Sequence, residues 1–413
     1  MFDHPSRRAV LRGGVAFTAW ATIPRLALAA GAPDPRFVAI ILRGGMDGLG
    51  VVAPVGDPAY EAVRDEFSMP LEGPDAAVPL DGFFALNRRM ETVAELYRRG
   101  EALFVHACHT AYRERSHFEA QDVLENGTAS EAHHRDGWLG RALSLLPADD
   151  RVGRHGAFAA ATSTPLLMRG ARDVINWLPA GFDAASHDTR ARLLSMYEHT
   201  DPALAKALGE GIAMEAVTGT EVEMASAVED VMMGMEVRRR QRDVVVAATA
   251  AGRAMAQEDG PRVGFVDMSG FDTHRRQSVV EGRIGDTLHT LDVAIAALRT
   301  ALGPAWQSTV VAVMTEFGRT VRMNGSDGTD HGTATVAMLL GGAVRGGRVI
   351  ADWPGLTPAA LHEGRDLKPT TDLRAVLKGV LADHLGMGRA ALGETVFPET
   401  AGLAPLAGLL RTG

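Results

Sequence analysis

Short apolar runs, bounded by glycine, proline or polar residues, recur along the chain and predict the strands of a buried sheet. Their β-branched content is typical of strands that are covered on both faces. Five runs have this character: Phe37–Leu42, Ala102–His106, Val263–Met268, Thr309–Met314 and Thr335–Leu340. We therefore predict that these five segments are strands of a parallel sheet.

Segments with helical patterns separate the predicted strands. They include Leu86–Arg99, Phe118–Glu125 and Val279–Leu302. This alternation is typical of an α/β fold with a doubly wound sheet. Between about residues 186 and 258 the chain is rich in Ala, Met, Glu and Arg and has almost no strand signal, which predicts a helical insertion. The proline-containing, acidic stretch 66–82 predicts an excursion on the surface.

The N-terminal segment has the pattern of an export signal. Arg7 and Arg8 form a twin arginine ahead of a soft apolar stretch, and Ala27–Ala29 is a small-x-small cleavage pattern. A proline and an arginine interrupt the apolar stretch, so it does not suit a stable membrane helix. We expect residues 1–29 to be a twin-arginine signal peptide and residues 30–413 to form a single domain. A short amphipathic helix that the mature protein keeps is the alternative.

The expected export route has consequences for location and partners. It implies a periplasmic or secreted protein that engages the twin-arginine translocase and has no membrane anchor in its mature form. Proteins that use this route fold before they cross the membrane, often with a cofactor in place. The export signal therefore directs attention to metal ions.

Composition excludes several classes of protein. The formal net charge of −9 argues against nucleic acid or an anionic membrane as a partner. A lone cysteine, Cys108, excludes an internal disulfide, so stability has to come from the core. The sequence contains no Walker loop, no GxSxG motif and no CxxC pair.

Acidic and imidazole side chains gather at or near the carboxyl ends of the predicted strands, where open parallel sheets bind ligands. Six residues have this placement: Asp47, Asp272, His274, Glu316, Asp330 and His331. Asp272 and His274 are two residues apart, so an extended backbone would turn both side chains to one side. Four carboxylates and two imidazoles are enough for one or two divalent ions.

Each of these residues also has a structural interpretation. Asp47 would stabilise a glycine turn, and Asp272 would form a hydrogen-bonded pair with His274. Glu316 would form an ion pair with Arg319. The loop around Asp330 would be an ordinary polar turn.

The segment that follows the second apolar run offers a nucleophile. Ser116 begins a predicted helix, whose N-terminus favours an anion or a deprotonated hydroxyl. Ser116 and Glu119 also fit a capping box, so a purely capping role stays open. His117 is a candidate for metal binding, proton transfer or packing. Arg113 and Arg115 suit bidentate binding of an oxyanion.

Five ordered motifs together resemble an exported bacterial family catalogued as domain of unknown function 1501. The motifs are Leu42–Leu49, Tyr112–Gln121, Phe271–His274, Thr315–Arg319 and Gly328–Gly332. The resemblance extends from about Phe37 to near the C-terminus. More remotely, that family is similar to the alkaline phosphatase and sulfatase superfamily, whose members bind metals at the carboxyl edge of a similar sheet.

The remote similarity implies an alkaline phosphatase-like α/β fold and a role for individual residues. It implies metal ligands at Asp47, Asp272, His274, Glu316 and His331, with Asp330 beside the last, and it places Ser116 at the position of the nucleophile. The chain departs from the superfamily in two ways. No Cys/Ser-x-Pro-x-Arg signature surrounds Ser116, and Phe317 follows Glu316 where a histidine is common.

We therefore expect an exported hydrolase of phosphate or sulfate esters that depends on one or two divalent ions, Zn²⁺, Ca²⁺, Mg²⁺ or Mn²⁺. The ions would lower the pKa of Ser116 or of a water, with His117 close by. Arg43, Arg115 or Arg319 would hold the oxyanion of a small anionic ester or glycan. The alternative is a non-enzymatic, metal-stabilised envelope protein that binds a glycan or a protein. A third interpretation has a structural metal or none.

Overall fold

The computed structural model describes residues 34–129, 135–147, 152, 156–177, 197, 205–206, 208–209, 235–280 and 282–411. The expected signal peptide lies outside the described residues. Most of the expected helical insertion that precedes Met235 lies outside them as well.

In the described part of the chain, nine strands form a mostly parallel central sheet. Their order is β11-β5-β10-β9-β1-β8-β6-β7, and β12 also pairs with β5. The strands are β1 (Arg36–Arg43), β5 (Ala102–His109), β6 (Ala157–Ala160), β7 (Val174–Asn176), β8 (Val263–Ser269), β9 (Thr309–Thr315), β10 (Thr335–Leu340), β11 (Arg348–Ile350) and β12 (Thr371–Asp372). All five predicted strands are present, and the predicted α/β class with a mostly parallel sheet is confirmed.

The direction of one strand differs from the prediction. β10 runs antiparallel to both β9 and β5, whereas β1 is parallel to β8 and β9. A parallel neighbour needs a crossover connection, usually a helix. The link 316–334 between β9 and β10 contains no helix, so the chain returns beside β9 in the opposite direction.

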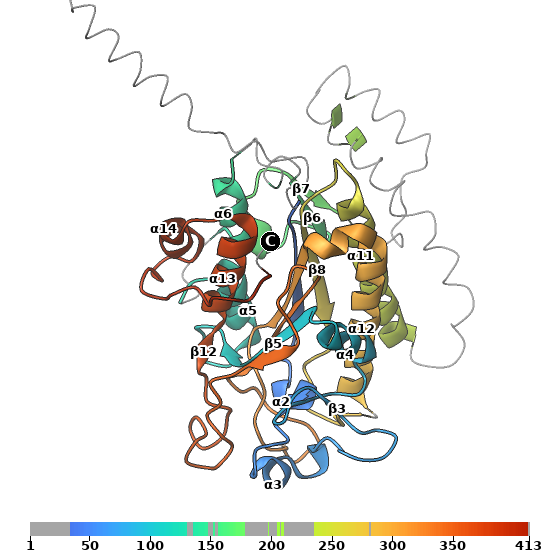
Figure 1. Cartoon of the computed structure of the whole chain (residues 1–413), viewed down its shortest axis with the longest axis vertical. Helices are drawn as coiled ribbons and strands as arrows, with labels where there is room; N and C mark the ends of the chain where they lie inside the picture. Colours follow the sequence, from blue (N-terminus) through green and yellow to red (C-terminus); the bar gives the residue numbers. More distant parts are fainter. Residues whose placement is uncertain are drawn as a thin grey trace, which may run out of the picture. The chain divides into compact units, whose positions relative to one another are not determined.

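One face of the sheet is covered by three helices. These are α4 (Glu91–Arg98), α11 (Met235–Ala256) and α12 (Arg283–Leu302), drawn together on one side of the strands in Figure 1. Val38 and Leu42 of β1 pack with them in one buried cluster. α11 lies within the expected insertion, yet its alanines are part of this main core.

The opposite face is covered by a second set of helices. α5 (His117–Asn126), α6 (Trp138–Leu145) and α13 (Leu373–Leu385) pack there with Phe37 and Ile41 of β1 (Figure 1). Alternate residues of β1 thus enter two different cores. This double burial explains why the strand has a continuous apolar sequence instead of an alternating one.

Two predicted helices begin later than expected. α4 starts at Glu91, because Ala85–Leu86 pairs as β4 with its neighbouring strands. α12 starts at Arg283, because Val279 packs into a third buried cluster before the helix begins.

The remaining described elements are short. A three-stranded antiparallel sheet has the order β2-β4-β3. Its strands are β2 (Val52–Ala53), β3 (Val78–Pro79) and β4 (Ala85–Leu86), and the short helices are α2 (Gly48–Val51), α3 (Tyr60–Arg64), η1 (Asp65–Phe67), η2 (Leu166–Met168), η3 (Gly303–Ser308), α14 (Arg389–Ala391) and η4 (Leu392–Val396). Within the described ranges, none of the helices is both long and apolar enough to cross a membrane.

Candidate metal centre

The loops that follow β1, β8 and β9 meet at the carboxyl edge of the sheet, and Arg319 ties them together. Its side chain is fully buried. Its guanidinium donates to the carbonyl oxygens of Gly44, Gly45, Phe271 and Thr329 and to Oδ1 of Asp272. Arg319 is one of three arginines expected to hold an oxyanion, and the contacts do not support this role, because the guanidinium is enclosed by acceptors of the protein itself.

A glycine allows the closest of these loop contacts. Gly44 has φ +118°, and a Cβ atom there would lie 2.3 Å from the backbone nitrogen of Asp272. A larger residue would push the β1 and β8 loops apart. The glycine turn is therefore a packing requirement of the site.

Three imidazole groups surround the carboxylate of Asp272. The Nε2 atoms of His274, His331 and His117 lie 3.1, 3.4 and 3.5 Å from Oδ1 of Asp272. The Nε2 atoms of His274 and His331 are 2.9 Å apart. One ligand atom from each of His117, Asp272 and His331 lies within 4.8 Å of the other two. We call His117, Asp272, His274 and His331 the histidine–aspartate group.

The far nitrogen of each imidazole is bound to a fixed acceptor. Nδ1 of His117 lies 2.8 Å from Oε1 of Glu316. Nδ1 of His274 lies 3.0 Å from Oδ1 of Asp330. Nδ1 of His331 lies 2.9 Å from the carbonyl oxygen of Arg115. These acceptors cannot donate, so each Nδ1 donates, and in the neutral ring each Nε2 keeps its lone pair.

The histidine–aspartate group fits a metal ion. Three lone pairs and a carboxylate that face one another repel unless a proton or a cation lies between them. Among the described residues, no hydrogen-bond partner reaches the buried Nε2 of His117, and an unpaired buried nitrogen is costly. Imidazole ligands oriented through Nδ1 are the usual arrangement in metal sites. A donor set dominated by nitrogen favours Zn²⁺ or another transition metal over Ca²⁺ and Mg²⁺.

The pKa values of two members of the group agree with this assignment, whereas the hydrogen bond and charge of Glu316 raise the pKa of His117. Partial burial of Asp272 favours its neutral form, but the hydrogen bond and charge of Arg319 outweigh that effect and lower the pKa of Asp272 to about 2. Burial lowers the pKa of His331 below its ordinary value. The site therefore presents an ionised carboxylate and a neutral imidazole at neutral pH.

Glu316 was predicted to bind metal directly, but the structure places it behind His117. Its side chain is fully buried, and both carboxylate oxygens are already occupied. Oε1 accepts from His117, from the backbone N–H of Gly44 at 2.8 Å and from Gln121 at 3.1 Å, while Oε2 accepts from Thr315 at 2.9 Å. The contacts therefore favour a role in which Glu316 orients the His117 imidazole over the predicted role as a direct ligand.

Asp330 lies behind His274 in the same way that Glu316 lies behind His117. Its Oδ1 accepts from His274 and from the amide of Asn324, so Asp330 acts through His274 instead of joining the group. The sequence had not marked Gln121 or Asn324 as functional residues. Gln121 lies one helical turn after His117, and that spacing is the signal that would have identified it.

We expect Glu316→Gln to weaken Zn²⁺ binding by about 10- to 100-fold, the usual effect of removing an acceptor behind a histidine ligand. The amide can donate to Nδ1 and thereby favour the wrong ring tautomer. Calorimetric titration of the metal-free protein measures the change. Glu125→Gln is the control, because Glu125 pairs with Arg43 outside the histidine–aspartate group. Unchanged affinity in Glu316→Gln would show that His117 does not depend on this acceptor.

Asp47 is not brought into the group. Only 1% of its side chain is exposed, and its Oδ2 atom lies 2.5 Å from both the guanidinium of Arg64 and the amide of Gln277. These contacts do not support the predicted ligand role, because Arg64 of α3 supplies the cation that this buried carboxylate needs. The alternative interpretation, a structural carboxylate at the glycine turn, agrees with the contacts.

Two further arginines are paired within the protein. Arg43 contacts Glu125 at 2.7 Å and Asp267 at 2.9 Å. The guanidinium of Arg115 contacts Asp366 and Glu363 at 2.9 and 2.6 Å. The prediction that either arginine binds a substrate oxyanion is not supported, because each guanidinium is already held by two carboxylates.

Ser116 precedes the ligand candidate His117 at the start of α5. Its backbone is extended, with φ −95° and ψ 125°, and its hydroxyl makes no capping hydrogen bond. The expected partner in a capping box, Glu119, accepts from the hydroxyl of Tyr112 instead. The capping interpretation is therefore not realised, and the role of nucleophile stays a prediction.

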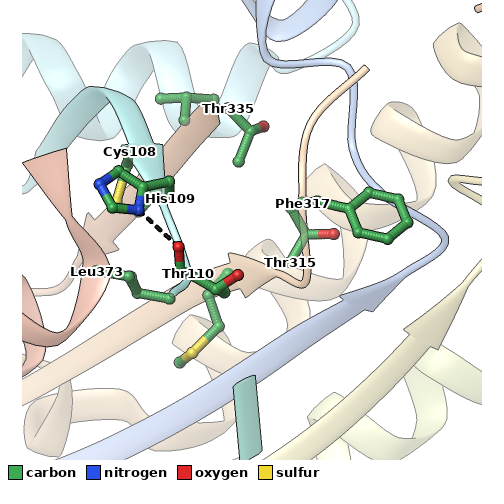
Figure 2. A pocket seen from close by; sticks show the side chains of 10 residues that line it. Cys108, His109, Thr110, Thr315, Phe317, Thr335 and Leu373 are labelled. Carbon is green, nitrogen blue, oxygen red and sulfur yellow. Dashed lines mark hydrogen bonds between the residues drawn. The ribbon is translucent and has the colours of Figure 1, made fainter. Parts of the chain in front are cut away.

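A small cavity lies next to the site and is lined by Cys108, His109, Thr110, Met314, Thr315, Phe317, Thr335, Val336, Ala337 and Leu373 (Figure 2). Its volume is about 10 Å³, which is close to the minimum for one water molecule. Phe317 is one of the lining residues, and its ring lies 4.9 Å from the rings of both His117 and His331. Phe317 therefore supports two imidazoles, and the cavity itself is too small for a substrate.

Family membership follows from the sequence as a whole. A family model described as "Protein of unknown function (DUF1501)" matches residues 34–396. The chain belongs to this family. The resemblance drawn from five short motifs is thereby confirmed. No curated protein matches this member of the DUF1501 family.

Two solved structures align with most of this DUF1501 protein at low sequence identity. The phosphonate monoester hydrolase of Agrobacterium radiobacter is 13% identical, and the match covers 90% of this chain and 78% of that one with a TM-score of 0.38. A 2-O GAG sulfatase is 10% identical, and the match covers 90% of this chain and 75% of the sulfatase with a TM-score of 0.41. Both TM-scores lie below 0.5, so we draw no functional conclusion from them.

Proposed function

We propose that this protein is an exported, metal-dependent hydrolase of phosphate or sulfate esters. The observation that supports the proposal is the convergence of three imidazole Nε2 atoms on the carboxylate of Asp272. Half of the Asp272 side chain is exposed, so a ligand can reach the group from solvent. Hydrolysis of an anionic ester needs a site that the ester can reach from solvent and that offers positive charge to its oxygen atoms.

His117, His274, His331 and Asp272 would hold the ion. When bound there, a divalent cation neutralises charge on the ester oxygens and lowers the pKa of a hydroxyl. Glu316 and Asp330 keep two of the imidazoles in the tautomer that binds. Asp272 stays ionised because of Arg319. Ser116, next to His117, remains our candidate for the attacking hydroxyl.

A second function is favoured by one specific observation. The three arginines that were expected to hold an oxyanion, Arg43, Arg115 and Arg319, are all paired within the protein. A metal-stabilised envelope protein that binds a glycan or another protein needs no arginine to hold an oxyanion. This alternative keeps the metal centre and predicts no turnover.

An assay on the purified mature protein separates the two functions. The protein is loaded with Zn²⁺ and offered aryl phosphates, aryl sulfates and aryl phosphonates, with and without a chelator. We expect turnover of at least one ester class, loss of that turnover on chelation, and recovery when Zn²⁺ is added back. Metal-loaded protein that is inert toward every ester would contradict a hydrolase and favour the binding protein.

We expect Ser116→Ala to lower turnover by about 1,000-fold or more, in the range known for the loss of a nucleophile. The free energy of unfolding should change by less than ~0.5 kcal/mol, since the hydroxyl makes no capping bond. Steady-state kinetics and urea denaturation measure the two quantities, with Ser68→Ala as a control away from the group. Unaltered turnover would remove Ser116 from the mechanism, and a large loss of stability would restore its capping role.

A further inference from the structure

His331 differs from the other two imidazoles in the kind of acceptor that holds it. His117 and His274 donate to carboxylates, whereas Nδ1 of His331 donates to the backbone carbonyl of Arg115 at 2.9 Å. The direction of a carbonyl is set by the conformation of its own backbone. The orientation of His331 therefore depends on how the backbone of Arg115 is fixed.

The backbone of Arg115 has a conformation that a residue with a side chain rarely adopts. Its φ angle is +60°, in the left-handed region that favours glycine. Such a conformation persists only where the surrounding structure enforces it, and it is common at functional sites. Arg115 is two residues before His117, so the strained position lies within the metal centre.

The side chain of Arg115 supplies the contacts that enforce this conformation. Nε and Nη2 donate to Oδ2 of Asp366 at 3.1 and 2.9 Å, and Nη2 also donates to Glu363 at 2.6 Å. Asp366 is fully buried, and its backbone is hydrogen-bonded to His362 in both directions. A guanidinium held through two nitrogens by a buried carboxylate has little freedom to rotate.

We propose that Arg115 is a positioning residue for His331 and not a substrate-binding residue. Its ion pair with Asp366 holds the left-handed backbone, and the carbonyl of that backbone then fixes the His331 ring with Nε2 toward Asp272. This inference rests on the proposed metal centre. It links the centre to the segment around Asp366, which is far away in the sequence.

Cobalt binding tests the proposal without reference to turnover. Co²⁺ is titrated into the metal-free full-length mature protein, and the dissociation constant and the visible absorption bands are recorded. We expect Arg115→Met and Asp366→Asn each to weaken Co²⁺ binding by about 10- to 100-fold and to change the absorption bands. The double variant should bind Co²⁺ no more weakly than either single variant, because each single variant already removes the same contact between Arg115 and Asp366.

Two further variants complete the test. Arg365→Met is the matched control, since Arg365 contacts the other oxygen of Asp366 at 3.2 Å and does not touch the group. It should bind Co²⁺ like the wild type. Arg115→Lys keeps the charge but loses the two-nitrogen contact, so we expect an intermediate affinity even if the other variants fold poorly.

The outcomes that overturn the proposal are distinct. Arg115 variants that bind Co²⁺ with wild-type affinity and absorption, but raise KM for an ester at unchanged kcat, would identify a substrate-binding arginine. Wild-type affinity and absorption in Arg115→Met, which removes the ion pair with Asp366, would already exclude the positioning role. If the wild type itself binds no Co²⁺, the metal centre and the proposed function fail together, and that result differs from a failure confined to the variants.

Discussion

His117→Ala and His331→Ala should each weaken Zn²⁺ binding by more than about 100-fold, which exceeds the usual effect of losing an acceptor behind a ligand. Each variant removes one of the ligand atoms that lie within 4.8 Å of one another. Competition with a chromophoric chelator measures the affinity. The effect should be larger than that of Glu316→Gln, because the glutamate acts only through His117.

A matched variant controls for general effects of removing an imidazole. His289 is exposed on α12 and has no contact with the histidine–aspartate group, so His289→Ala should bind Zn²⁺ normally. Wild-type affinity in either ligand variant would show that the corresponding imidazole does not bind the ion.

Arg319→Met should destabilise the protein by about 3–5 kcal/mol, because it removes a fully buried guanidinium on which several buried acceptors depend. The guanidinium donates to four backbone carbonyls from three loops in addition to Asp272, and methionine replaces none of these bonds. The loss of their donor leaves buried carbonyls unsatisfied, which adds to the cost. Urea denaturation of the metal-free protein measures the change in the free energy of unfolding.

Arg322→Met is the control for this variant, because Arg322 is exposed and lies three residues further along the same segment. We expect its stability to stay within ~0.5 kcal/mol of the wild type. A similarly small change in Arg319→Met would contradict the view that this guanidinium holds the three loops together.

The strands and the edge at which the site lies could be predicted from the sequence. Runs such as Phe37–Leu42 are buried on both faces, and double burial leaves a continuous apolar pattern that is easy to recognise. Because the carboxyl ends of parallel strands share one edge, Asp272 and Glu316, which follow β8 and β9, could be expected near each other. The direction of β10 could not be predicted, since an apolar run has the same sequence pattern in a parallel and in an antiparallel strand.

The roles of individual acids could not be predicted, because each role depends on a partner that only the fold supplies. Asp47 is neutralised by Arg64, which belongs to a short helix outside the predicted motifs. Glu316 is separated from the group by His117, a residue 199 positions earlier in the chain. An acidic residue at a strand end thus indicates a functional site. Its hydrogen bonds decide whether it binds a ligand directly or orients a neighbouring side chain.

The expected oxyanion-binding role of the arginines is not supported for the same reason. Arginine next to a candidate nucleophile suits oxyanion binding, and nothing in the local sequence shows that Asp366 will occupy Arg115. Long-range ion pairs of this kind connect segments that have no common pattern. They turn an expected substrate contact into part of the scaffold around the histidine–aspartate group.

X-ray absorption at the zinc edge of the Zn²⁺-loaded mature protein tests the central claim most directly. The proposed centre predicts one tightly bound ion whose ligands are mainly imidazole nitrogens at about 2.0–2.1 Å, together with carboxylate oxygen. A spectrum with oxygen ligands alone, or protein that retains no zinc after dialysis, would contradict a metal centre formed by the three histidines and Asp272.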